Sequence, residues 1–360
     1  MAALNNLDHR HFRRILIIKP SSLGDVIHAL PVLSGLRRRF PEARISWLVS
    51  TSCMGLMEGH PELDELIPFD RRRYGRVARS WKVTREFARF ALDLRARRFD
   101  LVLDLQGLFR SGLFAWICGA GVRMGFTSTR EFGWIFHTHR VYVPPRDLHA
   151  VDCNLLFARR LGLAEEPVRF SLPVQEGARS AVAAMLHQHG IRSGQGYALI
   201  APGTRWETKV WPVEYFAAVA RYVRSNHSLP VVLAGAPDEL GIAGRVQELA
   251  GEPVANLAGR TSLQQMVALV DGAAVAIMND TGPMHLAVAL GRPLVAVYGP
   301  TNAVRTGPYR RPESVARLDL ECSPCYLKRL KDCPHGHKCL KELAPETVCR
   351  QVSEALRGRG

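Results

Sequence analysis

A short apolar run that ends in an Asp-Thr-Gly turn restricts most strongly how this 360-residue chain can fold. Residues 274–278 are all apolar, as in a strand buried on both faces of a sheet. The turn consists of Asp280, Thr281 and Gly282, and a helical pattern and a second apolar run follow within 284–298. This order predicts a strand–turn–helix–strand unit whose helix start directs backbone N–H groups toward a phosphate. An ordinary N-cap formed by Asp280 or Thr281 is the alternative.

A second turn of the same kind lies near the start of the chain. The strand pattern of 14–19 leads through a short loop into helical spacing over 26–40. Gly24 permits close backbone approach, and Asp25 and His28 share one face of the helix. The loop has neither the glycines of a dinucleotide site nor the Lys-Ser/Thr pair of a Walker loop. Asp25 is therefore a candidate functional acid, with a simple helix cap as its alternative role.

Alternating strand and helix patterns continue along the chain and predict an α/β fold with two doubly wound, Rossmann-like parallel sheets. Ligands of such folds bind at the carboxyl ends of the strands. In the first series the expected strands are 15–19, 45–49, 101–104 and 141–143, and the expected helices are 26–40, 79–97 and 150–161. In the second series the expected strands are 197–201, 231–234, 275–278 and 294–298, and the expected helices are 178–189, 213–225, 239–249, 263–271 and 345–356. The boundary is expected within 167–177.

Composition excludes several classes of protein. The chain is 47% hydrophobic and 22% charged, which is typical of a globular protein. No apolar run approaches the roughly 20 residues of a membrane span. The first residues are polar and basic, without the apolar core of a secretory signal. A cytoplasmic location is the expectation, and there cysteines are thiols or metal ligands more often than structural disulfides.

Positive charge is concentrated in the first half of a chain whose formal net charge is +15. One segment carries Arg71, Arg72, Arg73, Arg76, Arg79, Lys82 and Arg85. Such a block is either a solvated face or a surface for an anionic membrane or a phosphorylated lipid. Nucleic acid is another usual partner of basic patches, but we find no zinc-finger spacing, RNP motif or basic region with heptads. No nucleic-acid partner is therefore expected.

Cysteines crowd together near the end of the chain. The cluster contains Cys322, Cys325, Cys333 and Cys339, with His335 and His337 between them. Thiols and imidazoles in such numbers can hold zinc or an iron–sulfur group, although the spacing matches no common zinc finger. Three alternatives stay open: a structural metal site that clamps a loop, reduced thiols without a ligand, and a redox-dependent disulfide.

Six short motifs resemble, in order and spacing, those of glycosyltransferase family 9, the heptosyltransferases of lipopolysaccharide core synthesis. They occupy residues 19–28, 104–108, 209–212, 235–239, 280–285 and 297–301. The resemblance covers nearly the whole chain and implies a GT-B fold of two facing Rossmann-like domains. It places an acceptor-side domain at 1–172 and a nucleotide-sugar-binding domain at 173–344. A C-terminal helix in 345–360 is expected to pack back on the first domain.

The same resemblance implies an inverting, metal-independent transfer of heptose from ADP-heptose to the Kdo/heptose inner core of lipopolysaccharide. The expected partners are ADP-heptose, an anionic lipid A core acceptor and, peripherally, the inner face of the cytoplasmic membrane. No cofactor is expected for catalysis. The motifs at 24–28 and 104–108 look like the first-heptose branch, whereas cysteine clusters occur especially in the second-heptose branch. Rival readings are another nucleotide-sugar donor, a non-catalytic nucleotide-sugar or anionic-lipid binding protein, and a nucleotide-sugar epimerase.

Asp25 is the residue that the resemblance assigns as the base that deprotonates the acceptor hydroxyl. A helix start lowers the pKa of a carboxyl group, which weakens a base unless burial or substrate binding opposes it. His28 is the competing base, because imidazole titrates near neutral pH. Acceptor binding is expected from Ser22, Arg72, Arg73, Arg76, Gln106 and Arg110. The arginines among them can pair with the carboxylates and phosphates of a lipid A core.

Lys209 is the expected catalytic cation on the donor side. A compact positive charge there would stabilise the departing diphosphate, as a metal ion does in other enzymes. Thr281 and Gly282 at the helix start can offer backbone N–H groups to the diphosphate. Thr204 can add a hydroxyl group.

Three further residues complete the expected donor site. Glu239 follows a strand at the position where doubly wound folds often bind ribose hydroxyls through a carboxylate. A first-turn helix acid is its alternative role. Asp280 and His285 match family residues that hold the donor sugar and its phosphates.

Overall fold

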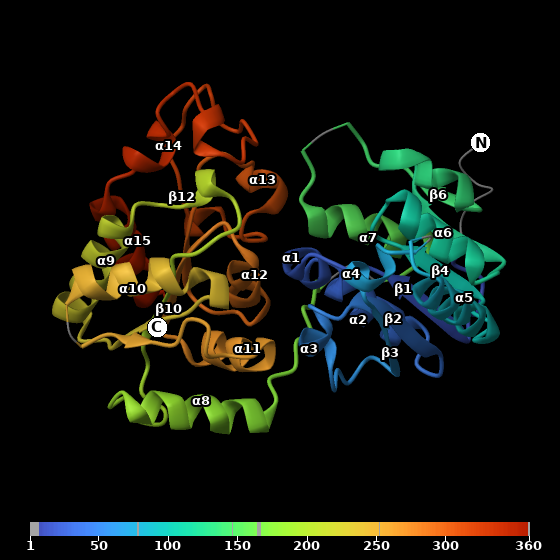
Figure 1. The fold of residues 1–360 in the computed structure, drawn as a ribbon, viewed down its shortest axis with the longest axis horizontal. Helices are drawn as coiled ribbons and strands as arrows, with labels where there is room; N and C mark the ends of the chain where they lie inside the picture. The colour runs from blue at the N-terminus through green and yellow to red at the C-terminus, as the bar shows by residue number, and fades with distance from the viewer. Residues whose placement is uncertain (1–6, 78, 146, 164–166, 252, 359–360) are drawn as a thin grey trace. The chain divides into compact units, whose positions relative to one another are not determined.

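The computed structural model describes residues 7–77, 79–145, 147–163, 167–251 and 253–358. They fold as two compact units, Met1–Pro173 and Val174–Gly360, which are described separately below (Figure 1). Each unit contains one six-stranded sheet, and the paired strands are parallel. This arrangement confirms the predicted α/β fold with two doubly wound sheets.

The first sheet has the strand order β3-β2-β1-β4-β5-β6. Its strands are β1 (Arg14–Ile18), β2 (Arg44–Ser50), β3 (Glu65–Phe69), β4 (Leu101–Asp104), β5 (Val122–Phe126) and β6 (His139–Val141). The sequence did not predict β3 and β5, because Pro68 and Gly125 interrupt their strand patterns. The order reverses between β1 and β4, so ligands are expected beside the carboxyl ends of these two strands.

The helix that follows β1 is interrupted. The prediction of one helix over 26–40 is wrong, since α1 (Leu23–Ile27) ends before α2 (Leu30–Arg39) begins. Pro31, in the first turn of α2, lacks the amide hydrogen that would continue α1. The break buries His28, which is 5% exposed.

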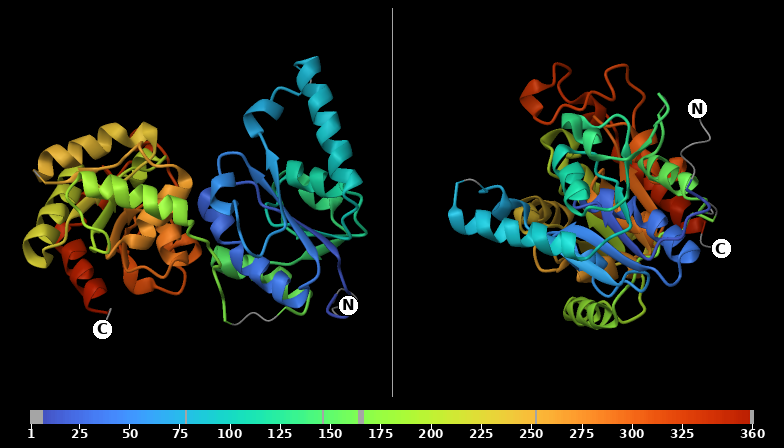
Figure 2. Two further views of the ribbon diagram at one scale, coloured as in Figure 1. Left: turned by 90° about the horizontal axis from the view of Figure 1, so that it is seen from below. Right: turned by 90° about the vertical axis from the view of Figure 1, so that its right-hand side faces the viewer.

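The remaining helices of the first unit are α3 (Met54–Met57), α4 (Arg71–Tyr74), α5 (Trp81–Ala96), α6 (Phe109–Ile117), the 3-10 helix η2 (Arg130–Phe136) and α7 (Ala150–Arg160). Helices α4 and α5 extend away from the rest of their unit, as both views of Figure 2 show. Stacked and tilted aromatic contacts among Phe69, Tyr74 and Phe90 anchor this extension to β3. Among the described residues, none of the helices is long and apolar enough to cross a bilayer.

The second sheet has the order β12-β11-β10-β7-β8-β9. Its strands are β7 (Ala198–Ala201), β8 (Val231–Leu233), β9 (Ala255–Asn256), β10 (Val275–Asn279), β11 (Leu294–Val297) and β12 (Val315–Ala316). Its helices are α8 (Glu176–Gln188), η3 (Glu207–Lys209), α9 (Val213–His227), η4 (Pro237–Glu239), α10 (Leu240–Ala250), α11 (Leu263–Gly272), α12 (Gly282–Ala289), α13 (Ala303–Thr306), η5 (Pro312–Ser314), η6 (Leu330–Asp332), α14 (Lys338–Lys341) and α15 (Pro345–Arg357). The order reverses between β7 and β10, as it does between β1 and β4.

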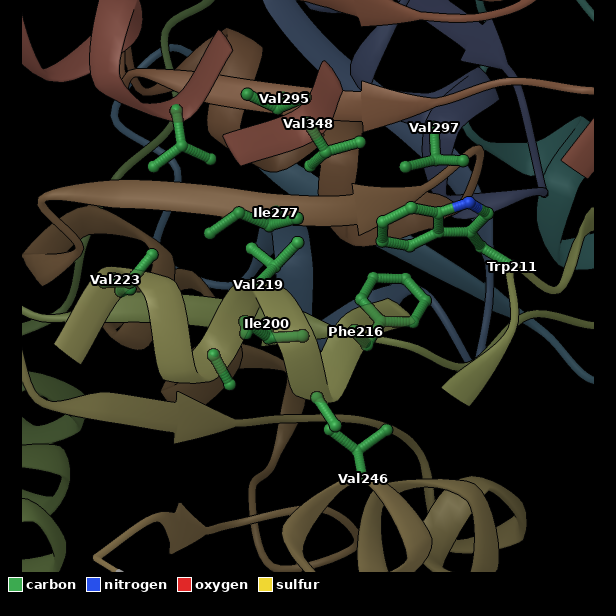
Figure 3. Packing of buried hydrophobic residues seen from close by; sticks show 14 of the residues in the cluster. Ile200, Trp211, Phe216, Val219, Val223, Val246, Ile277, Val295, Val297 and Val348 are labelled. Atoms are coloured by element: carbon green, nitrogen blue, oxygen red, sulfur yellow. The ribbon is translucent and has the colours of Figure 1, made fainter. Parts of the chain in front are cut away.

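The core of the second unit lies between its sheet and helices α9 and α15. Trp211, Phe216 and Val219 pack there against Ile277 of β10, together with Val348 of α15 (Figure 3). We expected the C-terminal helix to pack back on the first domain. Within the second unit, the apolar face of this helix is buried against α9, β10 and β11, and packing on the first domain stays a prediction.

Candidate active site

Asp25 stands at the start of α1, beside the carboxyl end of β1. Its Oδ2 accepts hydrogen bonds from the amide and the hydroxyl of Ser22, at 2.9 and 2.8 Å. This is the capping arrangement that the sequence offered as an alternative role. The side chain is nevertheless 43% exposed, so the carboxylate caps the helix and stays accessible to a substrate.

Lys19 connects the two loops at the reversal of strand order in the first sheet. Its ammonium group is buried and donates to the carbonyl of Leu105 at 2.7 Å, beyond the end of β4. The same Nζ lies 3.8 Å from Oδ1 of Asp25. A buried ammonium group requires such polar and charged partners. Lys19 was not among the predicted site residues, although a lysine directly after the apolar run 15–18 is a usable signal.

His28, the competing base, is buried behind α1. Its ring contacts the ring of His149 edge-on, with 5.2 Å between centroids. Its carbonyl accepts a hydrogen bond from the side chain of Asn154 in α7 at 3.0 Å. Because His28 is only 5% exposed, Asp25 is far more accessible to an acceptor hydroxyl.

Asp104 organises the loop that carries Gln106. The fully buried carboxylate accepts from the amides of Gln106 and Gly107 at 3.0 and 3.1 Å. It also accepts from the Ser111 hydroxyl at 3.0 Å and lies 3.1 Å from Nε2 of His137. Gly107 has a φ of +68°, a conformation that favours glycine. Gln106 is therefore held by its backbone, with its side chain half-buried. Asp104 and His137 were not among the predicted site residues.

The predicted acceptor arginines differ in their availability. Arg72, Arg73 and Arg76 line a shallow pocket of about 370 Å³ on α4 and α5. Arg73 forms a bidentate pair with Glu86, at 2.8 and 2.7 Å, which raises the pKa of Arg73 and lowers that of Glu86. Arg72 and Arg76 are exposed, as is Arg110 in the first turn of α6. The structure thus gathers the first three on one surface and leaves Arg110 on another helix.

Lys209 and Asp280 form a largely buried ion pair in the second unit. The Lys209 ammonium lies 2.6 Å from Oδ2 of Asp280, and the side chains are 15% and 7% exposed. The Thr301 hydroxyl donates to the same oxygen at 2.6 Å, and the Tyr298 hydroxyl lies 3.2 Å from the other. Burial, followed by the nearby Asp280, raises the pKa of Tyr298 well above its usual range. Asp280 therefore positions Lys209 rather than capping α12.

Asn279 fixes the loop that carries Thr204 and Lys209. This fully buried residue ends β10, and its Nδ2 donates to the carbonyl of Pro202 at 2.7 Å. Its Oδ1 accepts from the amide of Trp211 at 3.3 Å. One side chain thus holds both ends of the loop that follows β7. Thr204 is half-buried within this loop.

The N-terminus of α12 offers few backbone donors. Thr281 is the N-cap and makes no side-chain capping bond, and Gly282 is the first helical residue. Pro283 has no amide hydrogen, and the amide of Met284 bonds to the Thr281 carbonyl at 3.2 Å. The amides of Thr281 and Gly282 are therefore the donors to consider for a diphosphate. His285 is buried within the helix, one turn further on.

Trp206 and Lys328 lie beside Lys209 and were not among the predicted site residues. The ammonium of Lys209 lies 4.5 Å from the centroid of the Trp206 ring, and that of Lys328 lies 5.0 Å from it. Such cation–π contacts hold positive charge against the indole. The spacing of Trp206 and Lys209 was a usable signal, but Lys328 lies in the distant cysteine-rich segment.

Glu239 lies between the loops that follow β7 and β8. Its Oε2 accepts from the Ala236 amide at 2.8 Å. A Cβ atom at Gly203 would collide with the carboxyl group of Glu239, and one at Gly235 would lie 2.8 Å from Oε2. Desolvation by burial raises the pKa of Glu239, against the opposing effect of the Ala236 amide. The carboxyl group therefore caps η4 and also lies against the loop that follows β7.

The four C-terminal cysteines share one pocket of about 260 Å³. Cys322, Cys325, Cys333 and Cys339 line it, and all are free thiols. Burial, followed by the three neighbouring thiols, raises the pKa of Cys339 to about 11. Within the described part of the chain, no group of three or more His, Cys, Asp or Glu side chains is arranged to hold a metal ion. The alternative of a zinc or iron–sulfur site thus receives no support.

Comparison with known proteins connects this geometry to a family. Residues 87–334 match glycosyltransferase family 9 (heptosyltransferase). Lipopolysaccharide heptosyltransferase 1 of Pseudomonas aeruginosa is 32% identical over 360 residues, which cover 95% of this chain and 98% of that protein. Lipopolysaccharide heptosyltransferase 2 of Salmonella typhimurium is 28% identical over 360 residues, with coverages of 96% and 99%.

The fold agrees with the sequence match. The solved structure of E. coli heptosyltransferase WaaC with ADP gives a TM-score of 0.74 at 26% identity, covering 95% of this chain and 99% of its own. The resemblance found in the six motifs is thereby confirmed. The protein is a glycosyltransferase with the GT-B fold, and it belongs to glycosyltransferase family 9, the heptosyltransferases.

Proposed function

We propose that this protein transfers heptose from ADP-heptose to the Kdo/heptose inner core of lipopolysaccharide, with inversion at the transferred carbon. The buried pair of Lys209 and Asp280 beside the start of α12 carries the proposal. It provides a fixed positive charge where a diphosphate would meet backbone donors. A structural relative was solved with ADP, which supports an ADP-linked donor.

Donor binding divides into two parts. The diphosphate meets the Lys209 ammonium and the amides of Thr281 and Gly282, with Thr204 and His285 nearby in the same loop and helix. The ribose hydroxyls meet the carboxylate of Glu239 at the end of β8. Because Asp280 and Trp206 already hold Lys209, little ordering is needed when the donor binds.

The transfer step is a single displacement. The exposed Oδ1 of Asp25 accepts the proton of an acceptor hydroxyl, and that oxygen forms a bond to the anomeric carbon of the heptose. The bond from this carbon to the diphosphate breaks on the opposite face, and its electron pair leaves with ADP. Lys209 stabilises the negative charge that develops on the diphosphate. Lys19 positions Asp25, with its ammonium group 3.8 Å from Oδ1.

The acceptor side is proposed to recognise an anionic lipid. Ser22 and Gln106 lie on the loops that follow β1 and β4, where an acceptor sugar would approach Asp25. The arginines Arg72, Arg76 and Arg110 are exposed and can pair with carboxylates or phosphates of a lipid A core. Because this acceptor is held by a bilayer, we place the protein peripherally at the inner face of the cytoplasmic membrane.

One experiment tests the assignment. The purified protein is incubated with ADP-heptose and Kdo-lipid A, and the masses of the products are measured by mass spectrometry. We expect the acceptor to gain one heptose and ADP to be released, with Asp25→Asn as the inactive control. Consumption of the donor without an acceptor would favour an epimerase. Binding without turnover would favour a binding protein. A preference for UDP- or GDP-linked sugar would show that ADP-heptose is not the donor.

A further inference from the structure

Large apolar side chains are exposed side by side on α6 and η2. Phe109 and Trp116 on α6 are 43% and 56% exposed, and Phe132 and Ile135 on η2 are 71% and 51% exposed. The ring of Phe136 joins the two helices, with 5.2 Å to the Phe109 centroid and 6.5 Å to that of Trp116. We call Phe109, Trp116, Phe132 and Ile135 the aromatic ridge.

The two helices below the ridge are packed backbone to backbone. A Cβ atom at Gly112 of α6 would lie 2.6 Å from the carbonyl oxygen of Gly133. A Cβ atom at Gly133 would lie 2.7 Å from the carbonyl oxygen of Leu108. Only glycine permits this approach at either position. The ridge is therefore a fixed surface of the fold and not a pair of loose segments.

The backbone at Phe132 is unfavourable for the residue it carries. Glu131 and Phe132 have φ values of +61° and +59°, which non-glycine residues adopt at a cost. The hydroxyl of Thr129 accepts from the Trp134 amide at 2.8 Å and closes this turn. The strained turn presents a phenyl ring to solvent, which gains nothing for the stability of the isolated fold. Contiguous exposed apolar side chains mark a surface that binds another protein or a membrane.

Arginines border the ridge. Arg110 is the exposed neighbour of Phe109, and the exposed Arg140 holds its guanidinium 4.4 Å from the centroid of the Trp134 ring. Aromatic rings beside basic side chains suit the boundary between lipid head groups and acyl chains. A symmetric contact with a second copy would instead bring these arginines toward one another, in a chain whose formal net charge is +15.

We propose that the aromatic ridge, with Arg110 and Arg140, docks the protein on an anionic phospholipid bilayer. Helix α6 follows the Gln106 loop and η2 follows β5. Both therefore begin on the side of the sheet where the carboxyl ends of the strands and Asp25 lie. Docking there brings a lipid-borne acceptor to the carboxyl ends of the strands, beside the proposed base Asp25. The inference rests on the proposed function only for the identity of that acceptor.

Binding to phosphatidylglycerol vesicles tests the surface. The double variant Phe132→Ser/Ile135→Ser should bind the vesicles at least about tenfold more weakly, because two apolar side chains no longer enter the bilayer. The control is Trp81→Ser on α5, which removes an apolar side chain that is 82% exposed and is not part of the ridge. Arg140→Gln should reduce the preference for phosphatidylglycerol over phosphatidylcholine, and high salt should mimic it.

A glycine substitution separates docking from folding. Phe132→Gly relieves the unfavourable φ, so it should keep or raise the melting temperature while it weakens vesicle binding. A purely structural Phe132 would show the opposite pattern. Vesicle binding unchanged in the ridge variant, or lost equally in the α5 control, overturns the proposal. A wild-type dimer that becomes a monomer in the ridge variant would also overturn the proposal.

Transfer assays keep the two proposals distinguishable. The ridge variant should transfer heptose to a deacylated, water-soluble acceptor at the wild-type rate and should slow with acceptor embedded in vesicles. Equal slowing with both acceptors overturns the docking role. If the wild type transfers to neither acceptor, the proposed function fails, while the vesicle measurements still decide whether the ridge binds a bilayer.

Discussion

The two units share one strand order but build their switch points differently. In the second unit, Lys209 and Asp280 are largely buried and held by hydroxyl groups and by an indole ring. In the first unit, the carboxylate of Asp25 is 43% exposed and the acceptor arginines lie on helices at the surface. A nucleotide diphosphate has one shape and suits a preformed site, whereas a lipid-borne sugar must be approached from a surface.

The largest effect should come from the first unit. Replacing Asp25 with Asn leaves the Ser22 contacts nearly intact but removes the proton acceptor. We expect turnover to fall by roughly 10²–10⁴-fold, with ADP affinity nearly unchanged because ADP is proposed to bind the other unit. Turnover is measured by release of ADP and affinity by calorimetry. Activity within about threefold of wild type would remove Asp25 from the mechanism.

In the second unit, binding and chemistry should fail together. Lys209→Ala removes the charge at the diphosphate and leaves Asp280 buried without its cation. We expect transfer to fall by about 10²–10³-fold and ADP affinity to fall as well. Lys328→Ala is the matched control, because Lys328 contacts the same indole but is exposed. Equal losses in the two variants would contradict a special role for the buried pair.

Acidification should weaken the donor site through Glu239. Burial raises the pKa of this carboxyl group, so ADP affinity should begin to fall at a higher pH than for an ordinary glutamate. Protonation removes the acceptor for ribose hydroxyls, and we expect a loss of about tenfold. The effect on folding has the opposite sign, since a raised native pKa adds stability as pH falls through it. Calorimetry with ADP across pH checks the trend, and Glu239→Gln should abolish it.

The acceptor arginines should give a smaller, salt-dependent effect. Replacing Arg72 and Arg76 with Ser should raise the acceptor KM severalfold at low ionic strength without changing ADP affinity. The effect should shrink in high salt, because exposed charges are screened over about 10 Å at 0.1 M. Arg73→Ser is the contrasting variant, since it also breaks the pair with Glu86. Unchanged acceptor kinetics would leave this segment as a solvated face.

The cysteine pocket should matter least for transfer. Cys322→Ser and Cys325→Ser should each change the transfer rate by less than about twofold at low temperature, because the proposed displacement uses no residue of this pocket. Cys339 should react slowly with thiol reagents, since its raised pKa keeps it protonated at neutral pH. About one equivalent of zinc or iron in purified protein, lost in either variant, would restore the metal alternative.

Sequence patterns predicted the central strands well and the interrupted elements poorly. Strands β1, β4, β10 and β11 are apolar except for single polar residues at the ends of the first three, because both of their faces are buried. Strands β3 and β5 carry residues that disfavour strands, and Pro31 stops a helix whose apolar spacing continues. Local sequence patterns do not show whether a proline or glycine is tolerated in a strand or ends a helix, because the packing of the folded chain determines this.

Individual site residues were easier to predict than their partners. Lys209 and Asp280 were both chosen from motifs, but their ion pair joins segments far apart in the sequence, so spacing could not show it. Lys19 was overlooked because its partner Leu105 contributes only a backbone carbonyl. Lys328 was not predicted because its partner Trp206 lies far from it in the sequence.

Glu239 lies in a narrow space, and this space concerns the part of the proposed donor site that would bind ribose. The carboxyl group occupies a slot that exists only while positions 203 and 235 lack side chains. Gly235 lies outside the loop that carries Lys209 and outside α12, whereas Gly203 belongs to that loop, directly before Thr204. A change at position 235 is therefore expected to alter affinity for the nucleoside more than affinity for the diphosphate. An added methyl group there would displace the carboxylate that we propose binds ribose, while the loop that carries Lys209 would keep its sequence.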